Sequence, residues 1–148
     1  MPHIERTARV QWDGNVARGA GSIDAMSGAF EQLPYTLASR IGNPEGKTSP
    51  EELLAAAHGG CFTMSLASEL VKAGVPPGRL HVRCKIEMDE VEGQGHQIVG
   101  SVVEFVVQAE GADDAALEAA LKEADEGCPF SALLKRAGAT VDVSARLA

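Results

Sequence analysis

Aromatic residues are scarce in this chain of 148 residues. One Trp, one Tyr and four Phe make up 4% of the sequence, and they are not interleaved with basic residues. Proteins that bind single-stranded nucleic acid stack bases on aromatic rings set in a basic groove. We therefore expect no nucleic acid partner, and we expect a core built from Ala, Val, Leu and Ile.

Long uninterrupted hydrophobic runs are also missing. The most apolar segment, residues 53–75, is broken by glycines and by polar residues that include His58, Glu69 and Lys72. A membrane span of that length would carry few or no such residues, so we expect a buried helix and no membrane partner. The polar opening of the chain is not followed by an apolar stretch, which predicts no signal peptide and a cytoplasmic location where thiols stay reduced.

The composition is that of an ordinary globular protein with an acidic balance. Hydrophobic residues make up 45%, and the net charge is −8. At this length we expect a single domain over residues 1–148. Residues 110–126 hold seven acidic residues and one lysine, a net charge of −6. A solvated helix face is the simplest interpretation, and a docking surface for a basic partner is the alternative.

The pattern of apolar residues predicts an antiparallel α+β fold. The expected strands alternate apolar and polar residues. The expected helices carry apolar residues on one face and begin with residues that can cap a helix. Pro50 follows two capping residues, Thr48 and Ser49, and opens the longest helix. The expected elements are a hairpin at 7–24, a strand at 33–39, a helix from 50 to about 74, strands at 80–89 and 98–108, an acidic helix whose inner side carries Leu117, Leu121 and Ala124, a short helix at 129–136, and a last strand with Val141, Val143 and Ala145 in alternation.

The long helix is apolar nearly all round, which is typical of a helix at the centre of a protein or of an oligomer. A chain this small is not expected to bury such a helix on every side by itself, so the pattern indicates that a second copy of the chain packs against it.

Three cysteines carry the chemical interest of the sequence. Cys84 lies on the apolar face of a predicted strand, where a thiol behaves as a small hydrophobe. Cys61 follows two glycines in the long helix, and each glycine costs about 1 kcal/mol of helix stability relative to Ala, so something must approach the backbone closely. Cys128 precedes Pro129 at a helix start, where the amide dipoles favour a thiolate. Packing remains the alternative for Cys61, and an unpartnered turn residue the alternative for Cys128.

His58 stands three positions before Cys61, so the two side chains can share one helix face. One interpretation is a Cys/His hydrolase pair, although no orienting carboxylate is placed. A zinc site is weaker still, because the sequence offers no second pair of ligands at comparable spacing. We expect no metal and no other cofactor.

Two motifs resemble the OsmC/Ohr family of osmotically inducible and organic hydroperoxide resistance proteins. Residues 48–62 are similar to the first-cysteine signature, and residues 127–131 are similar to the second-cysteine motif. Further segments resemble the OsmC branch, namely Trp12-Asp13-Gly14, Arg18-Gly19, Pro34-Tyr35 and Arg40. The resemblance implies an OsmC-like fold, with antiparallel sheets around two long central helices in an intertwined homodimer.

The same resemblance implies a thiol-dependent peroxidase that acts on organic hydroperoxides, an antioxidant function of the stress response. Cys61 matches the peroxidatic cysteine, Cys128 the resolving cysteine, Arg40 the activating arginine and Glu51 the carboxylate that orients it. The implied cycle passes through a Cys61 sulfenic acid and a Cys61–Cys128 disulfide. An external dithiol reductant, for which a lipoyl-type dithiol is one candidate, then restores both thiols.

The chemistry of the residues agrees with this assignment. A thiol near neutral pH needs a permanent cation to ionise, and only Arg guarantees one. Glu51 and Cys61 are ten residues apart, about 15 Å along a straight helix, so we expect Arg40 and Glu51 to reach the sulfur of the other chain.

Apolar residues near the motifs are candidates for substrate binding. They are Tyr35, Phe130, Phe62 and Met64, with Pro34 beside them, and core packing is the alternative for each. Three functions therefore follow from the sequence: the peroxidase, a Cys/His hydrolase, and a non-enzymatic ligand-binding dimer that uses the same pocket.

Overall fold

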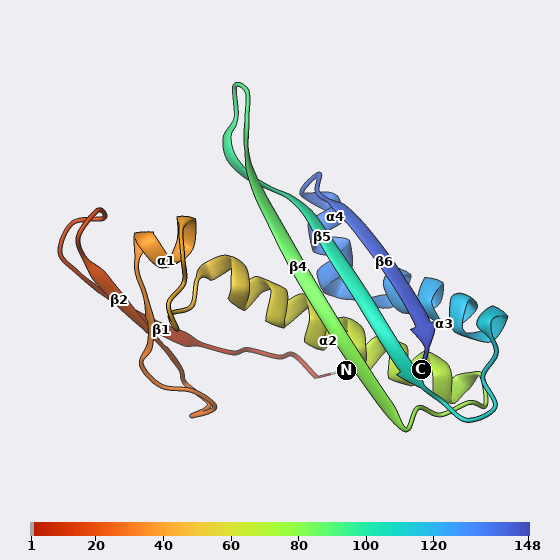
Figure 1. Cartoon of the computed structure of the whole chain (residues 1–148). Coiled ribbons are helices and arrows are strands. Elements are labelled where there is room, and N and C mark those ends of the chain that lie inside the picture. The colour runs from red at the N-terminus through yellow and green to blue at the C-terminus, as the bar shows by residue number, and fades with distance from the viewer. Residues whose placement is uncertain (1) are drawn as a thin grey trace. The chain divides into compact units, whose positions relative to one another are not determined.

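The computed structural model describes residues 2–148 and has the α+β composition that the sequence predicts (Figure 1). By its internal contacts the chain divides into one compact unit that ends at Leu53 and another from Leu54 to Ala148. A single domain over the whole chain stays a prediction. The elements are β1 (Ala8–Asp13), β2 (Ala20–Ala25), β3 (Leu33–Tyr35), α1 (Leu37–Ile41), α2 (Pro50–Lys72), β4 (Arg79–Val91), β5 (Gly95–Gln108), α3 (Asp114–Gly127), α4 (Pro129–Arg136) and β6 (Thr140–Leu147).

The first unit is built on the antiparallel sheet β1-β2-β3. The predicted hairpin is confirmed, with Ala8 paired to Ala25 and Asp13 paired to Ala20. Gly21 on β2 lies between two rings, those of Trp12 and Tyr35, whose centroids are 5.4 Å apart. A Cβ at Gly21 would overlap the Tyr35 ring and come 2.7 Å from Cε3 of Trp12. Glycine is therefore what lets these two aromatic residues meet across the strand.

The strand expected at 33–39 is wrong in its second half. β3 ends at Tyr35, and α1 follows. Thr36 and Ser39 form a reciprocal capping box: the Thr36 hydroxyl accepts the Ser39 N–H at 3.0 Å, and the Ser39 hydroxyl accepts the Thr36 N–H at 2.9 Å. These local bonds satisfy the first turn of a helix and overcome the weak alternation that favoured a strand. The helix places Arg40 in its last turn.

The long helix α2 begins where the sequence predicts. Pro50 is its first residue, and the Ser49 hydroxyl accepts the Glu52 N–H at 3.2 Å, a typical N-cap bond. The helix ends at Lys72, and Gly74 follows with φ +78°. Within residues 2–148, no helix combines the length and the apolar character that crossing a membrane requires.

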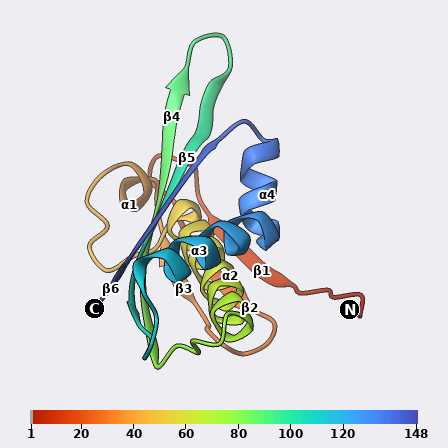
Figure 2. The same ribbon diagram turned by 90° about the vertical axis from the view of Figure 1, so that its right-hand side faces the viewer.

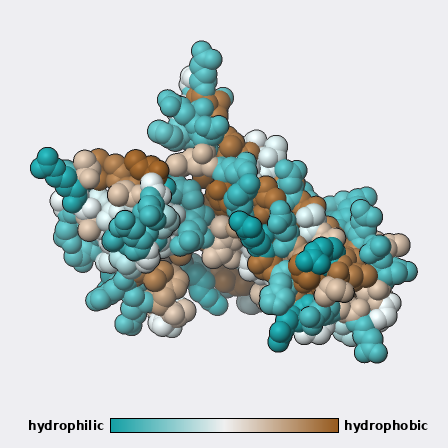
Figure 3. Space-filling model, in the orientation of Figure 1, coloured by the Kyte–Doolittle hydropathy of each residue, from teal (hydrophilic) through white to brown (hydrophobic). Residues whose placement is uncertain are grey.

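The second unit contains the sheet β4-β5-β6. β4 and β5 form a long antiparallel hairpin that projects beyond the helices, and its tip is hydrophilic (Figures 1 and 3). The sheet departs from the expected antiparallel arrangement at one pair, because β6 runs parallel to β5. Parallel neighbours need a crossover connection, and α3 and α4 supply it.

Helices α2 and α3 pack against one face of this sheet (Figures 1 and 2). The inner side of the acidic helix α3 contains Leu117, Leu121 and Ala124, as predicted, which leaves its acidic residues outside. The two phenylalanine rings of the core, Phe62 and Phe105, are 5.3 Å apart. The remaining buried members are mostly aliphatic, namely Leu66, Leu70, Val103, Val107, Leu117, Ala120, Leu121, Ala124 and the thiol residue Cys128.

Candidate functional site

The thiol of Cys128 lies close enough to Cys61 to raise the pKa of the Cys61 thiol. They are 67 positions apart in the sequence (128 − 61), and both are free thiols. α2 carries Cys61 in its middle, whereas Cys128 lies at the junction between α3 and α4. The fold thus brings together the two sulfurs that the sequence singles out.

Cys128 is the N-cap residue of α4. It is fully buried, and its sulfur accepts the N–H of Ser131 at 3.4 Å. Pro129, at the first helical position, supplies no N–H and keeps the backbone ready for the helix. The Cys128 sulfur therefore caps the first turn of α4.

Cys61 is half-buried, and its surroundings oppose ionisation. Burial raises the pKa of the Cys61 thiol, and the hydrogen bond and charge of Cys128 raise it further. A hydrogen bond with the backbone of Phe130 lowers the pKa and is the weakest of these effects. A thiolate at Cys61 near neutral pH therefore requires an additional positive charge.

His58 is fully buried one helical turn before Cys61 and is bound at both ring nitrogens. Nδ1 lies 2.7 Å from the hydroxyl of Ser101 on β5, and Nε2 lies 2.8 Å from the hydroxyl of Ser131 on α4. Burial lowers the pKa of His58, the charge of Asp125 opposes that shift, and the charge of Lys135 adds to it. Both nitrogens are thus engaged by serines, which gives no support to a Cys/His hydrolase.

Cys84 is partly buried against the core, as expected for a packing residue. Its sulfur is 3.5 Å from the Ser101 hydroxyl and 3.9 Å from Nδ1 of His58. A Cβ on Gly59 would come 3.1 Å from Cβ of Cys84, so the first of the two helix glycines permits the close approach of α2 to β4. Among the described residues, no three His, Cys, Asp or Glu side chains gather where they could hold a metal ion.

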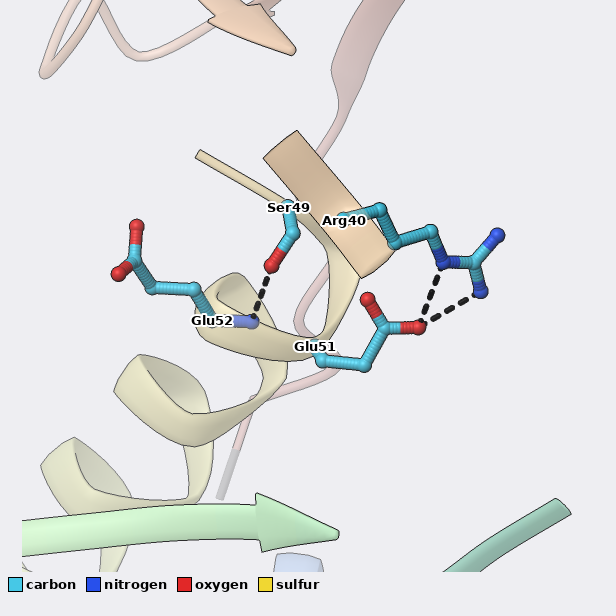
Figure 4. Close-up of polar contacts among 4 residues, drawn as sticks. All are labelled: Arg40, Ser49, Glu51 and Glu52. Atoms are coloured by element: carbon cyan, nitrogen blue, oxygen red, sulfur yellow. Dashed lines mark hydrogen bonds and ion pairs between the residues drawn. The ribbon is translucent and has the colours of Figure 1, made fainter. Parts of the chain in front are cut away.

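In the first unit Arg40 and Glu51 form an ion pair. A single carboxylate oxygen, Oε1, accepts from Nε of Arg40 at 2.8 Å and from Nη2 at 2.6 Å (Figure 4). The pKa of Arg40 is raised, chiefly by this hydrogen bond, so the guanidinium stays charged. The other oxygen, Oε2, is buried with no hydrogen-bond partner in the described part of the chain. Glu51 thus binds the arginine through one oxygen rather than two, and its role in orienting Arg40 for catalysis stays a prediction.

Arg40 also borders a hollow of about 370 Å³ in the first unit. Its wall is mostly apolar and includes the Trp12 and Tyr35 rings, and the guanidinium is its charged group. The complete lining is Trp12, Val16, Tyr35, Thr36, Leu37 and Arg40. Such a pocket suits a ligand with an apolar body and a polar end.

The other predicted substrate contacts are differently placed. Phe62 has no exposed surface and packs in the core, which fits the packing alternative. Phe130 packs partly against the core, and its backbone contacts Cys61. Met64 is 76% exposed on α2.

Sequence reasoning missed two groups of this site. Ser101 and Ser131 bind His58 from positions 43 and 73 residues away, and only the fold shows such contacts. Trp12 on the pocket wall was noted only as part of a motif, and its pairing with Tyr35 across Gly21 carries no sequence signal beyond the glycine itself.

A family model described as OsmC-like protein matches residues 42–144. Peroxiredoxin OsmC of Escherichia coli strain K12 is 33% identical over 132 residues, which cover 89% of this chain and 91% of that protein.

Several solved structures share the fold. An OsmC-like protein of unknown function from Vibrio cholerae has a TM-score of 0.78 at 16% identity and covers 97% of this chain and 100% of its own. An organic hydroperoxide resistance protein OsmC from Legionella pneumophila has a TM-score of 0.70 at 20% identity, with 96% of each chain covered. The organic hydroperoxide resistance protein OhrB of Bacillus subtilis has a TM-score of 0.67 at 23% identity and covers 96% and 98%.

Proposed function

Since the chain belongs to the OsmC-like protein family, we propose that it is a thiol-dependent peroxidase that reduces organic hydroperoxides to alcohols. The observation that carries the proposal is the proximity of two free thiols, Cys61 and Cys128, which is close enough for Cys128 to raise the pKa of Cys61. Two thiols in contact, one half-buried and one at a helix start, are suited to form a reversible disulfide. The name of the Escherichia coli relative, a peroxiredoxin, supports the same reaction class.

In the proposed cycle the Cys61 thiolate attacks the distal oxygen of the hydroperoxide. The O–O bond breaks, the alkoxide leaves and takes up a proton as the alcohol, and Cys61 becomes a sulfenic acid. The Cys128 thiolate then attacks the Cys61 sulfur, an S–S bond forms, and the hydroxyl leaves as water after protonation. An external dithiol, oxidised in turn to its own disulfide, returns both cysteines to thiols.

Arg40 is the proposed cation for this chemistry. Its charge counters the burial that raises the pKa of Cys61, and its N–H groups can hold the peroxide oxygens. The ion pair with Glu51 fixes the direction of the guanidinium. The hollow with Tyr35 and Trp12 on its wall is the proposed site for the alkyl group, which would favour organic hydroperoxides over hydrogen peroxide.

We propose that the protein works as a homodimer, with Arg40 and Glu51 of one chain serving Cys61 of the other. An exposed stripe along α2 supports a partner there: Met64 and Val71 are 76% and 59% exposed. Gly60 is exposed on the same stripe, and a Cβ there would meet nothing within 4 Å. Small and apolar residues on an uncovered central helix are typical of a helix that packs against a second copy. The cycle also fits a reducing compartment such as the cytoplasm.

The test is peroxide consumption with cumene hydroperoxide as the substrate and dihydrolipoamide as the reductant. We expect the wild-type chain to turn over, Cys61→Ser to lose all activity, and Cys128→Ser to complete one oxidation but not sustain dithiol-driven turnover. Cys84→Ser is the matched control and should keep wild-type rates. If the wild-type chain consumes no hydroperoxide yet binds it, the protein is a ligand-binding dimer and the proposal fails.

A further inference from the structure

Two contacts join helix α2 to helix α4, and they lie side by side. In one, Cys61 meets Cys128, and in the other, Nε2 of His58 lies 2.8 Å from the Ser131 hydroxyl. His58 precedes Cys61 by three positions, whereas its partner Ser131 follows Cys128 by three positions, so the two segments are antiparallel. Residues three apart on a helix are neighbours on its surface, so the two contacts between α2 and α4 are adjacent to each other.

The His58 link is anchored at its far end as well. Nδ1 lies 2.7 Å from the hydroxyl of Ser101, on the central strand of the second sheet. A neutral imidazole has one donor and one acceptor nitrogen, so one serine accepts from the ring and the other donates to it. All three side chains are fully buried. A buried polar group that loses its hydrogen-bond partner costs stability, so the bonds to Ser101 and Ser131 hold the His58 ring in a single orientation.

Ser131 passes this constraint on to the sulfur. Its hydroxyl binds His58, while its own N–H donates to Sγ of Cys128 at 3.4 Å. The bond from Ser131 to the His58 ring ties the first turn of α4 to α2, and the amide that holds the Cys128 sulfur belongs to the same turn. The position of the Cys128 sulfur above the start of α4 therefore depends on the ring of His58.

We propose that His58 is a positioning residue that holds Cys128 ready to attack the oxidised Cys61, through the hydroxyl and the amide of Ser131. This inference rests on the proposed function. It gives His58 a role in catalysis although His58 does not contact the substrate. The step served is the condensation of the Cys61 sulfenic acid with the Cys128 thiol to give one disulfide and one water. His58 takes no part in the earlier attack on the peroxide.

Because His58 serves disulfide formation and not the first oxidation, its loss should slow only the second of these steps. Without the His58 link, Cys61 is oxidised at the normal rate but its sulfenic acid lives longer. A long-lived sulfenic acid meets a second peroxide and advances to sulfinic acid, which the dithiol does not reduce. A role in stability alone would not separate the two steps in this way.

The experiment mixes reduced protein with two equivalents of cumene hydroperoxide, enough for a second oxidation, and stops the reaction at intervals with dimedone and an alkylating agent. Mass spectrometry then counts the thiol, the sulfenic adduct, the disulfide and the sulfinic acid. Ser131→Ala removes the hydroxyl and keeps the amide, and His58→Gln replaces the ring. A double variant of both tests whether the two residues act as one unit.

We expect each single variant to slow disulfide formation about tenfold, which corresponds to about 1.4 kcal/mol, and to leave the first oxidation within about twofold of wild type. The double variant should be no slower than the worse single variant. Thr63→Ala is the control: it removes a half-buried hydroxyl of α2 that donates to the Gly59 carbonyl at 2.7 Å, and it should form the disulfide at the wild-type rate.

Disulfide formation at the wild-type rate in both single variants would overturn the inference, as would a control that is slowed equally. Either result leaves the proposed function intact, because the disulfide still forms. A wild-type chain that forms no disulfide with cumene hydroperoxide would instead overturn the proposed function. Ser131→Ala is the smaller change and keeps the test decisive if His58→Gln does not fold.

Discussion

One carboxylate oxygen of Glu51 accepts two N–H groups of Arg40, at 2.8 and 2.6 Å. These two bonds hold the guanidinium of Arg40, a residue that also borders the hollow in the first unit. Because charge-assisted pairs of this kind are directional as well as strong, the role that we propose for Glu51 is to orient Arg40.

The first prediction concerns this ion pair. Glu51→Gln should lower kcat/KM for cumene hydroperoxide about 10- to 100-fold, because a misplaced cation stabilises neither the thiolate nor the leaving oxygen. Steady-state kinetics with dihydrolipoamide would measure the loss. Glu52→Gln is the control: its Oε1 accepts from the Thr48 hydroxyl at 2.9 Å, away from Arg40, and its kinetics should match wild type. Equal losses in both variants would count against an orienting role.

The second prediction concerns the acidity of Cys61. Cys128 raises the pKa of the Cys61 thiol through its hydrogen bond and charge, whereas burial is the largest cause of the rise. Cys128→Ala should therefore move the titration of Cys61 to lower pH without removing the whole shift. The ultraviolet absorbance of the thiolate, followed against pH in a Cys84→Ser background, measures it. An unchanged or higher pKa would show that Cys128 does not oppose ionisation.

The third prediction follows from the lowered pKa of His58, for which burial is the first cause. The unfolded chain then binds a proton near the ordinary value of 6.5 that the folded chain does not bind. The free energy of unfolding should fall as the pH drops below about 6.5 towards the folded pKa, and it should be independent of this group above that range. Asp125 and Lys135 act on the pKa of His58 in opposite directions, since Asp125 raises it and Lys135 lowers it.

Urea unfolding between pH 5 and pH 8 measures this dependence, and His58→Gln should flatten it. The other histidines, His3, His81 and His96, are exposed and serve as the background. A slope that survives the substitution would assign the dependence to a different group.

The fourth prediction separates the two helix glycines. Gly59→Ala should destabilise the fold, because its Cβ would come 3.1 Å from Cβ of Cys84, whereas the space around Gly60 is open within the chain. If a second copy packs there, Gly60→Ala should weaken the dimer although it raises helix propensity by about 1 kcal/mol. Analytical ultracentrifugation over a dilution series measures the dimer, and thermal unfolding measures the fold. A Gly60→Ala dimer as tight as wild type would contradict packing at this point.

The sequence predicts most elements because their signals are local. The capping residues before Pro50, the alternation in β4 and the apolar side of α3 each depend on a few neighbouring residues. α1 was missed although its capping pair, Thr36 and Ser39, is visible in the sequence, because the segment was interpreted by alternation alone. The parallel pairing of β6 depends on how two helices cross the sheet, which no local pattern records.

For the site, the sequence predicts which residues have distinctive chemistry, but it does not predict which residues they contact. Cys61, Cys128, Arg40 and Glu51 are identified by a resemblance, and the structure pairs them two by two. Ser131 belongs to a recognised motif, yet its bond to His58 depends on a tertiary contact over 73 residues. Serine is too common for its position alone to indicate that role.

The single tryptophan of the chain, Trp12, lies on the wall of the hollow beside Tyr35. Its indole N–H donates to the Gly14 carbonyl at 3.0 Å, so the ring is held in place while one side borders the opening. The molecule therefore contains its own optical reporter: a ligand that enters there changes the polarity around the indole and hence its emission. Occupancy can be followed by intrinsic fluorescence in the unlabelled protein, including variants that have lost both reactive sulfurs.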